Sequence, residues 1–114
     1  SVGTTTNKLY LDGISQQLTL PVGSRWAFDI LVIGCTGGSS TAAFQIRGVV
    51  RNYLGTTTLV GTPQVTTLGA DPVLGWTAWV AADNASDALG ILVSGSSGAD
   101  VGWVASVRTV EIMW

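Results

Sequence analysis

The residues of this chain that could do chemistry are seven carboxylates, four arginines, one lysine and one cysteine, because histidine is absent. Without histidine, no Ser-His-Asp or Cys-His nucleophilic arrangement can form, and no imidazole can ligate a metal. The single lysine, Lys8, belongs to no Ser-x-x-Lys pattern, and Gly34–Gly38 lacks the spacing and the lysine of a phosphate-binding loop. Glycoside hydrolysis needs only two carboxylates, so it is the enzyme class that is hardest to exclude.

Most of the carboxylates are predicted to shape turns. Five aspartates adjoin Gly, Pro, Asn or Ala, where an aspartate usually serves turn geometry: Asp12, Asp71, Asp83, Asp87 and Asp100. Glu111 is the only glutamate, and the loop aspartates match no calcium-loop spacing. We therefore expect a protein that is not an enzyme and that uses no metal and no cofactor.

Asp29 is different because it interrupts an apolar run. It could pair with Arg47 or Arg108 across a sheet or a subunit boundary, as a polar contact that gives specificity; a functional site is the alternative. Arg47 and Arg51 share one face of a strand at positions i and i+4. They could form a solvated outer face or an inter-subunit ion pair, or they could contact an acidic glycan.

The aromatic residues offer the usual means of stacking on a sugar ring. Trp76 and Trp79 are three residues apart, so on a regular strand they point to opposite faces, one into the core and one outward. Tyr53 lies at an expected hairpin tip beside Arg51 and Asn52. The candidate receptor-binding residues are therefore Arg51, Tyr53, Trp76, Trp79 and Asp83.

Alternation with a period of two residues dominates the chain, which predicts strands and no useful helix. Turn signals recur every eight to twelve residues, as in an antiparallel β-sandwich or jelly roll of about eight strands. A single domain over residues 1–114 is expected. The expected strands are Asn7–Asp12, Gln17–Leu20, Arg25–Cys35, Ala42–Asn52, Thr57–Gly61, Gln64–Leu68, Gly75–Asp83, Ala88–Ser94 and Val101–Trp114.

The surface is expected to be poor in charge. Charged residues make up 11% of the chain, against about 25% in an average protein. The strands Arg25–Cys35 and Val101–Trp114 are apolar on both faces. One face of the last strand fits a sandwich interior, so we expect the other to meet a copy of the same chain. The residues expected at that interface are Asp29, Arg47, Arg108 and Trp114.

Charge and hydropathy also limit the partners. The net charge is −2, so nothing steers the chain toward nucleic acid or an anionic membrane. No apolar run reaches the length of a membrane span. Cys35 is alone and is expected to be a small core residue, with a reactive thiol as the alternative.

The order of several segments resembles the C-terminal domain of bacteriophage tail fibre and tailspike proteins. The segments that carry the resemblance are LPVGSRWAFDILV (Leu20–Val32), AFQIRGVVRN (Ala43–Asn52), LVGTPQVTTLGAD (Leu59–Asp71), WTAWVAADNASDALGILVSG (Trp76–Gly95) and WVASVRTVEI (Trp103–Ile112). Together they cover most of the chain. Each alone is a generic strand sequence, and their order is the specific part.

The resemblance implies a homotrimeric β-sandwich or jelly-roll module at the far end of a fibre or spike on the virion. Such a module locks the trimer, contacts a host surface polysaccharide or lipopolysaccharide, or both, and joins upstream fibre or spike domains. It implies no enzymatic activity. The alternatives are a purely structural trimerisation cap or folding chaperone and, more remotely, a glycan hydrolase. The chain begins at Ser1 and ends at Trp114 within an apolar stretch, which fits the distal part of a longer protein.

Overall fold

The computed structural model of the chain describes residues 6–9, 18–71, 75–95 and 101–114. These residues form eight strands and no helix. The strands are β1 (Thr6–Leu9), β2 (Leu18–Thr19), β3 (Ser24–Cys35), β4 (Thr41–Tyr53), β5 (Thr56–Ala70), β6 (Thr77–Asp83), β7 (Ala88–Ser94) and β8 (Gly102–Met113). Within the described ranges, no helix has the length and hydropathy needed to cross a membrane.

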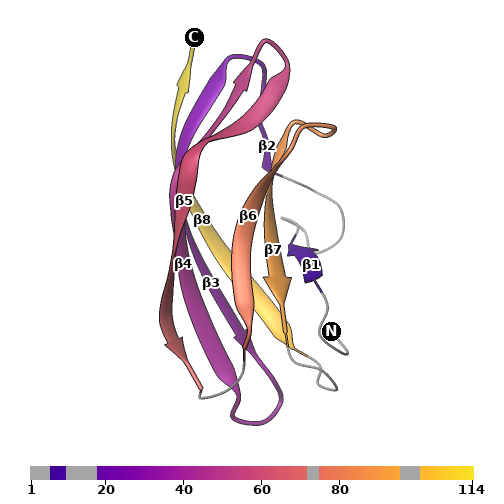
Figure 1. The fold of residues 1–114 in the computed structure, drawn as a ribbon, viewed down its shortest axis with the longest axis vertical. Coiled ribbons are helices and arrows are strands. Elements are labelled where there is room, and N and C mark those ends of the chain that lie inside the picture. Colours follow the sequence, from indigo (N-terminus) through magenta and orange to yellow (C-terminus); the bar gives the residue numbers. More distant parts are fainter. Residues whose placement is uncertain (1–5, 10–17, 72–74, 96–100) are drawn as a thin grey trace.

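The strands form two antiparallel sheets that lie face to face (Figure 1). The long sheet has the order β5-β4-β3-β8. In the short sheet, β7 pairs with β6 on one side and with β1 and β2 on the other. In the long sheet, β8 returns beside the first strand of the β3-β4-β5 meander, which is the strand order of a Greek key. The predicted all-β, two-layered architecture is therefore confirmed.

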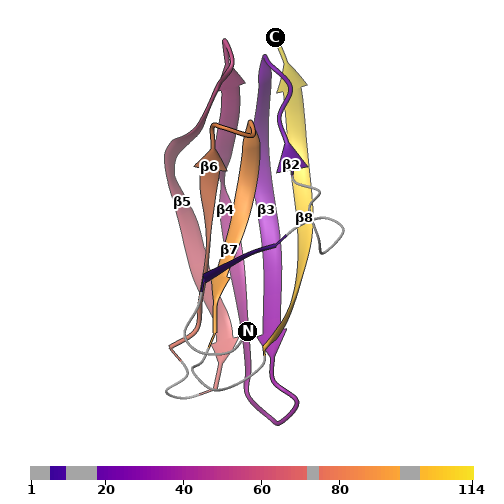
Figure 2. The ribbon, with the colours of Figure 1, turned by 90° about the vertical axis from the view of Figure 1, so that its right-hand side faces the viewer.

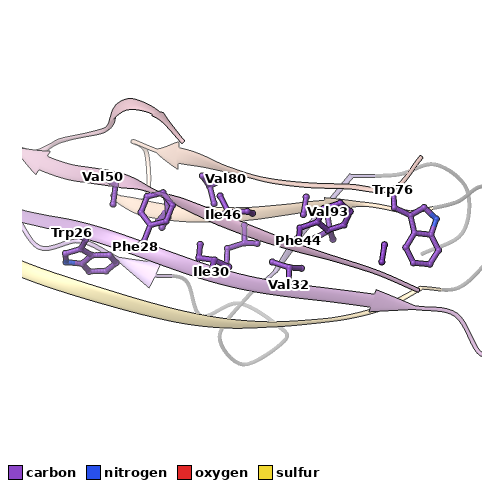
Figure 3. Close-up of a cluster of buried hydrophobic side chains, with 14 of the residues drawn as sticks. Trp26, Phe28, Ile30, Val32, Phe44, Ile46, Val50, Trp76, Val80 and Val93 are labelled. Carbon is purple, nitrogen blue, oxygen red and sulfur yellow. The ribbon is translucent and has the colours of Figure 1, made fainter. Parts of the chain in front are cut away.

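Strict alternation in β3 and β4 builds the core. The large apolar residues at alternate positions of both strands point inward, and the short sheet covers them (Figure 3). The buried members from these two strands are Trp26, Phe28, Ile30, Val32, Phe44, Ile46 and Val50. Because successive side chains of a strand point to opposite faces, the residues between them form the outer face of the long sheet.

A buried polar network joins the two sheets at one end of the sandwich. We call this the hairpin end, because the β2–β3 turn, the β4–β5 hairpin and the β6–β7 turn meet there (Figure 1). Nδ2 of the fully buried Asn52 donates to the carbonyl oxygen of Leu20 (2.9 Å), and the Leu20 N–H donates to the carbonyl of Asp87 (2.7 Å). The Thr57 hydroxyl donates to the Asp87 carboxylate (2.9 Å), and its N–H donates to Oδ1 of Asn84 (2.8 Å).

Replacing Asn52 with alanine is expected to lower the free energy of unfolding by about 2 kcal/mol, because the buried Leu20 carbonyl loses its side-chain donor. Urea denaturation followed by tryptophan fluorescence measures this change. The control is Thr58→Ala, which removes an exposed side chain of the same hairpin and is expected to stay within about 0.5 kcal/mol of the wild type. Equal stability of the two variants would contradict a structural role for the network.

Aromatic rings close the opposite end of the core. Trp103 of β8 packs against Trp76, with ring centroids 5.7 Å apart, and against Phe44 at 6.5 Å. The Trp103 ring lies over Gly34, where a Cβ atom would come within 2.6 Å of it. Gly34 is therefore required by the close approach of an aromatic ring to the backbone.

Two details differ from the sequence-based expectations. Thr57–Gly61 and Gln64–Leu68 are parts of one continuous strand, β5, because one bulge, opposite the stretch between Arg47 and Val49 of β4, absorbs Gly61 and Pro63 without ending the pairing. Cys35 is exposed and is not a core residue, since β3 alternation places Gly34 inward and its neighbour outward. The predicted turn residues Asp12 and Asp100 lie outside the described residues.

Candidate binding surface

The outer face of the long sheet exposes an unusual amount of apolar side chain. In the described part of the chain, no second layer covers it, and the sheet spans the molecule from β5 at one edge to β8 at the other (Figure 2). The exposed apolar residues on this face are Leu31, Ile33, Val49, Val60, Val104, Val110 and Ile112. Large exposed apolar patches of this kind mark interaction sites.

A charged row crosses the middle of this face. Arg47 of β4 and Arg108 of β8 are the register partners of Asp29 on β3. Nε of Arg47 lies 3.9 Å from a carboxylate oxygen of Asp29, and the Gln45 amide donates to the other oxygen at 3.1 Å. The predicted pairing of Asp29 with Arg47 is confirmed, within one subunit.

A second basic group lies on the same face at the hairpin end. Arg25 and Arg51 are register partners on β3 and β4. The Arg25 guanidinium lies 5.9 Å from the centroid of the Tyr53 ring, and one of its nitrogens donates to the Gly23 carbonyl (3.2 Å). Tyr53 is 54% exposed. The structure thus brings together two of the predicted receptor residues, Arg51 and Tyr53, and adds Arg25.

Arg25 was not among the receptor-binding residues predicted from the sequence, although its position in the strand indicates the outer face. It begins the alternation that places Ala27 and Asp29 on the outer face. The length of the single loop that joins β3 to β4 sets the register that places Arg25 opposite Arg51.

Two hollows on the outer face meet at Ala27. One, of about 410 Å³, lies between β3, β4 and β5 and includes Asp29, Arg47, Val49 and Val60 in its lining. The other, of about 280 Å³, lies between β3 and β8 and includes Arg108 and Val110. A small residue at position 27, flanked by valines on both neighbouring strands, produces this depression.

The other candidate residues lie elsewhere. Trp76 is only 5% exposed and packs in the core, so the prediction that it contacts a glycan is wrong. Trp79 is half-buried on the outer face of the short sheet, since its neighbours Ala78 and Val80 face the core. The two tryptophans do point to opposite faces, as the spacing predicts.

Asp83 is the last residue of β6, beside the β6–β7 turn, and accepts a hydrogen bond from the Ser86 N–H of that turn (3.2 Å). Asp71 similarly accepts from the Thr41 N–H (2.7 Å), and Asp87 has a positive φ of 49° and binds Thr57. Local turn chemistry is therefore confirmed for Asp83 and Asp87, whereas the contact of Asp71 joins the end of β5 to the start of β4 across 30 positions of sequence.

The last strand, β8, is exposed on its outer face and only partly buried on its inner face. Its outer residues Val104 and Val110 are 69% and 77% exposed. Its inner residues Ala105 and Val107 pack against the core but are only partly buried. Trp114, which follows the strand, is 94% exposed, and its N–H donates to the Gly23 carbonyl (3.1 Å).

The surface offers hydrophobic contact, guanidinium groups and one carboxylate. Among the side chains that the structure describes, no group of three or more Cys, Asp or Glu residues is placed to hold a metal ion. In the comparisons with known proteins, no family model matches the chain and no curated protein matches it either.

Proposed function

We propose that this chain is a distal module of a bacteriophage tail fibre or tailspike, which assembles as a homotrimer and recognises a host cell-surface polysaccharide or lipopolysaccharide. The observation that carries the proposal is the uncovered apolar outer face of the long sheet, together with β8, whose inner residues are only partly buried. The resemblance of the ordered strand segments to the C-terminal domains of these phage proteins supplies the biological setting. That setting is the virion, outside the host cell, with further fibre or spike domains upstream.

The two edges of the long sheet differ in a way that supports assembly through β8. The β5 edge carries Pro63, a glycine with φ of +75° at position 61 and two register shifts, which are the usual protections against edge pairing. The twelve-residue β8 contains no proline and has only two charged residues, Arg108 and Glu111. Within the described residues it pairs with β3 alone.

The subunit contact that fits these facts uses β8 and the half of the outer face away from the hairpin end. That half carries Leu31, Ile33 and Val104. The charged row of Asp29, Arg47 and Arg108 borders it, and a polar border around an apolar centre is usual for protein interfaces. Trp114, the fourth predicted interface residue, is highly exposed but lies at the hairpin end beside the start of β3, so it falls outside this contact.

In this arrangement the hairpin-end half of the outer face stays exposed in the trimer and would bind the receptor. Arg25, Arg51 and Tyr53 combine guanidinium donors with an exposed ring, and three copies would raise the avidity of a weak site through effective concentration. The role is binding rather than catalysis. The jelly-roll topology stays a prediction, which the Greek-key order of the long sheet supports.

Two measurements on the 114-residue chain test the proposal. Light scattering with size-exclusion chromatography is expected to give the mass of three chains, each of 11.8 kDa. An array of bacterial surface glycans is expected to give binding that is stronger for the trimer than for a monomeric variant. A monomeric wild type would overturn the assembly role. A trimer that binds no glycan would favour the structural cap, and release of reducing sugar would favour the hydrolase.

A further inference from the structure

All four arginines of the chain lie on one face. They follow the outward alternation of their strands on the long sheet: Arg25 on β3, Arg47 and Arg51 on β4, and Arg108 on β8. Asp29 is the only acid that these paired strands place on that face. The chain as a whole has a net charge of −2. The molecule therefore concentrates positive charge on this one face although its total charge is negative.

The arginines stand in two rows that flank an apolar row. Register places Arg51 beside Arg25 in the first row and Arg47, Asp29 and Arg108 in the second. Between them lie Val49, Ala27 and Val110, which are also register partners. Because residues two apart on a strand are separated by about 6.8 Å, the two basic rows stand roughly 14 Å apart.

The apolar row coincides with the two hollows that meet at Ala27. They form a shallow groove that runs across the strands, with Ala27, Val49 and Val110 as its apolar floor. Arg47 and Arg108 line one side of it together with Asp29. Arg25 and Arg51, the first row, lie on the opposite side of the apolar row, outside the lining of the hollows. Tyr53 lies beyond the first arginine row and exposes its ring next to Arg25.

The guanidinium groups of the first row, Arg25 and Arg51, are available to bind an anionic ligand. Within the described residues, no carboxylate pairs with Arg25 or Arg51; Arg25 contacts only the Gly23 carbonyl and the Tyr53 ring. A guanidinium binds a carboxylate through two parallel hydrogen bonds. An apolar floor and an exposed phenol ring suit the C–H faces of a sugar, as in ligand sites where a few polar groups orient an otherwise apolar contact.

We propose that this groove binds an acidic polysaccharide, with uronic-acid carboxylates on the arginines and sugar faces on Ala27, Val49 and Tyr53. The inference rests on the proposed function as a glycan-recognition module and names the chemical class of the receptor. A negative chain with a single basic face fits the spaced carboxylates of such a polymer better than the dense phosphates of a nucleic acid.

Polygalacturonate is the probe, with dextran as its neutral counterpart and dextran sulfate as a non-specific polyanion. Biolayer interferometry at 0.15 M NaCl is expected to show that the wild-type chain binds polygalacturonate and not dextran. Arg25→Gln with Arg51→Gln is expected to weaken binding at least tenfold. Arg51→Lys keeps the positive charge but removes the planar guanidinium that forms two parallel hydrogen bonds with a carboxylate. Its affinity is therefore expected to lie between those of the wild type and the double variant.

Filling the floor tests the groove independently of charge. Ala27→Phe is expected to weaken binding at least tenfold, whereas Ala85→Phe, on the exposed β6–β7 turn, is expected to leave it unchanged. The mass of each variant in solution is measured alongside.

Several results would overturn the inference. Unchanged binding by the arginine double variant or by Ala27→Phe would show that the ligand binds elsewhere. Equal affinity for dextran sulfate and polygalacturonate would show that binding is a non-specific attraction to polyanions. Loss of the trimer in the double variant would make the groove a subunit contact. Binding only to neutral glycans would refute this inference and leave the proposed function standing, whereas failure to bind any glycan would refute both.

Discussion

The Val104→Glu variant is expected to have the mass of one chain under conditions where the wild type has the mass of three. Val104 is exposed in the single subunit, so the substitution leaves the fold of that subunit intact. In the proposed trimer the same position is covered by a neighbour, and burying an unpaired carboxylate at each of three contacts costs several kcal/mol apiece. Light scattering measures the mass, and circular dichroism checks the fold.

The matched control is Val22→Glu, which places the same charge at a similarly exposed valine on the β2–β3 turn. That variant is expected to remain trimeric. A Val104→Glu protein that keeps the mass of the wild type would show that the outer side of β8 faces solvent in the assembly. The apolar residues of this face would then need another explanation.

The Gly34→Val variant is expected to lower the free energy of unfolding by about 3 kcal/mol. A side chain at this position collides with the Trp103 ring, and overpacking of a core usually costs about 1–3 kcal/mol. Displacing Trp103 also breaks its contacts with Trp76 and Phe44, which adds about 1 kcal/mol. Urea denaturation of the variant and the wild type measures the difference.

Gly37→Val is the control, because a Cβ at Gly37 meets nothing within 4 Å and the residue is not among those with positive φ. Its stability is expected to match the wild type within about 0.5 kcal/mol. If both glycine variants were equally stable, Trp103 would not be seated over β3, and the end of the core would be built differently.

Alternation was enough to predict most of the two central strands. In β3 and β4 the apolar period of two is interrupted in the middle only by Gly48, so the sequence alone identified the inward rows and the basic outer row with Arg47 and Arg51. The same reasoning named Arg47 and Arg108 as the possible partners of Asp29, because a lone acid on an apolar strand favours a cross-strand partner, and the structure selects Arg47.

The failures have a common physical origin in effects that alternation does not encode. Glycine and proline at positions 61 and 63 suggested a break, but a bulge admits extra residues without ending a ladder. The prediction that Cys35 is a core residue rested on its apolar neighbours in sequence, whereas its odd-numbered position on β3 places it on the outer face. Trp76 precedes β6, so its burial depends on packing against Trp103 from the far end of the sequence.

The candidate site was predicted only in part for a similar reason. Arg51 and Tyr53 are close in sequence and fall on one face, whereas Arg25 joins them only through the register of β3 with β4. Trp79 and Asp83 both lie on β6 of the other sheet. Sorting such residues between two layers requires the topology, which a single sequence determines weakly.

The pairing of β3 with β8 also bears on how the chain reaches its native state. Ser24 at the start of β3 is the partner of Met113 at the end of β8, and their side chains are 89 positions apart in sequence. Such non-local pairing slows folding, because the entropy of closing a long loop is lost before the contacts form. During synthesis, β3 cannot pair with β8 until almost all of these residues have left the ribosome. Until then, the hydrogen-bonding groups on one edge of β3 are unpaired and can associate with other chains.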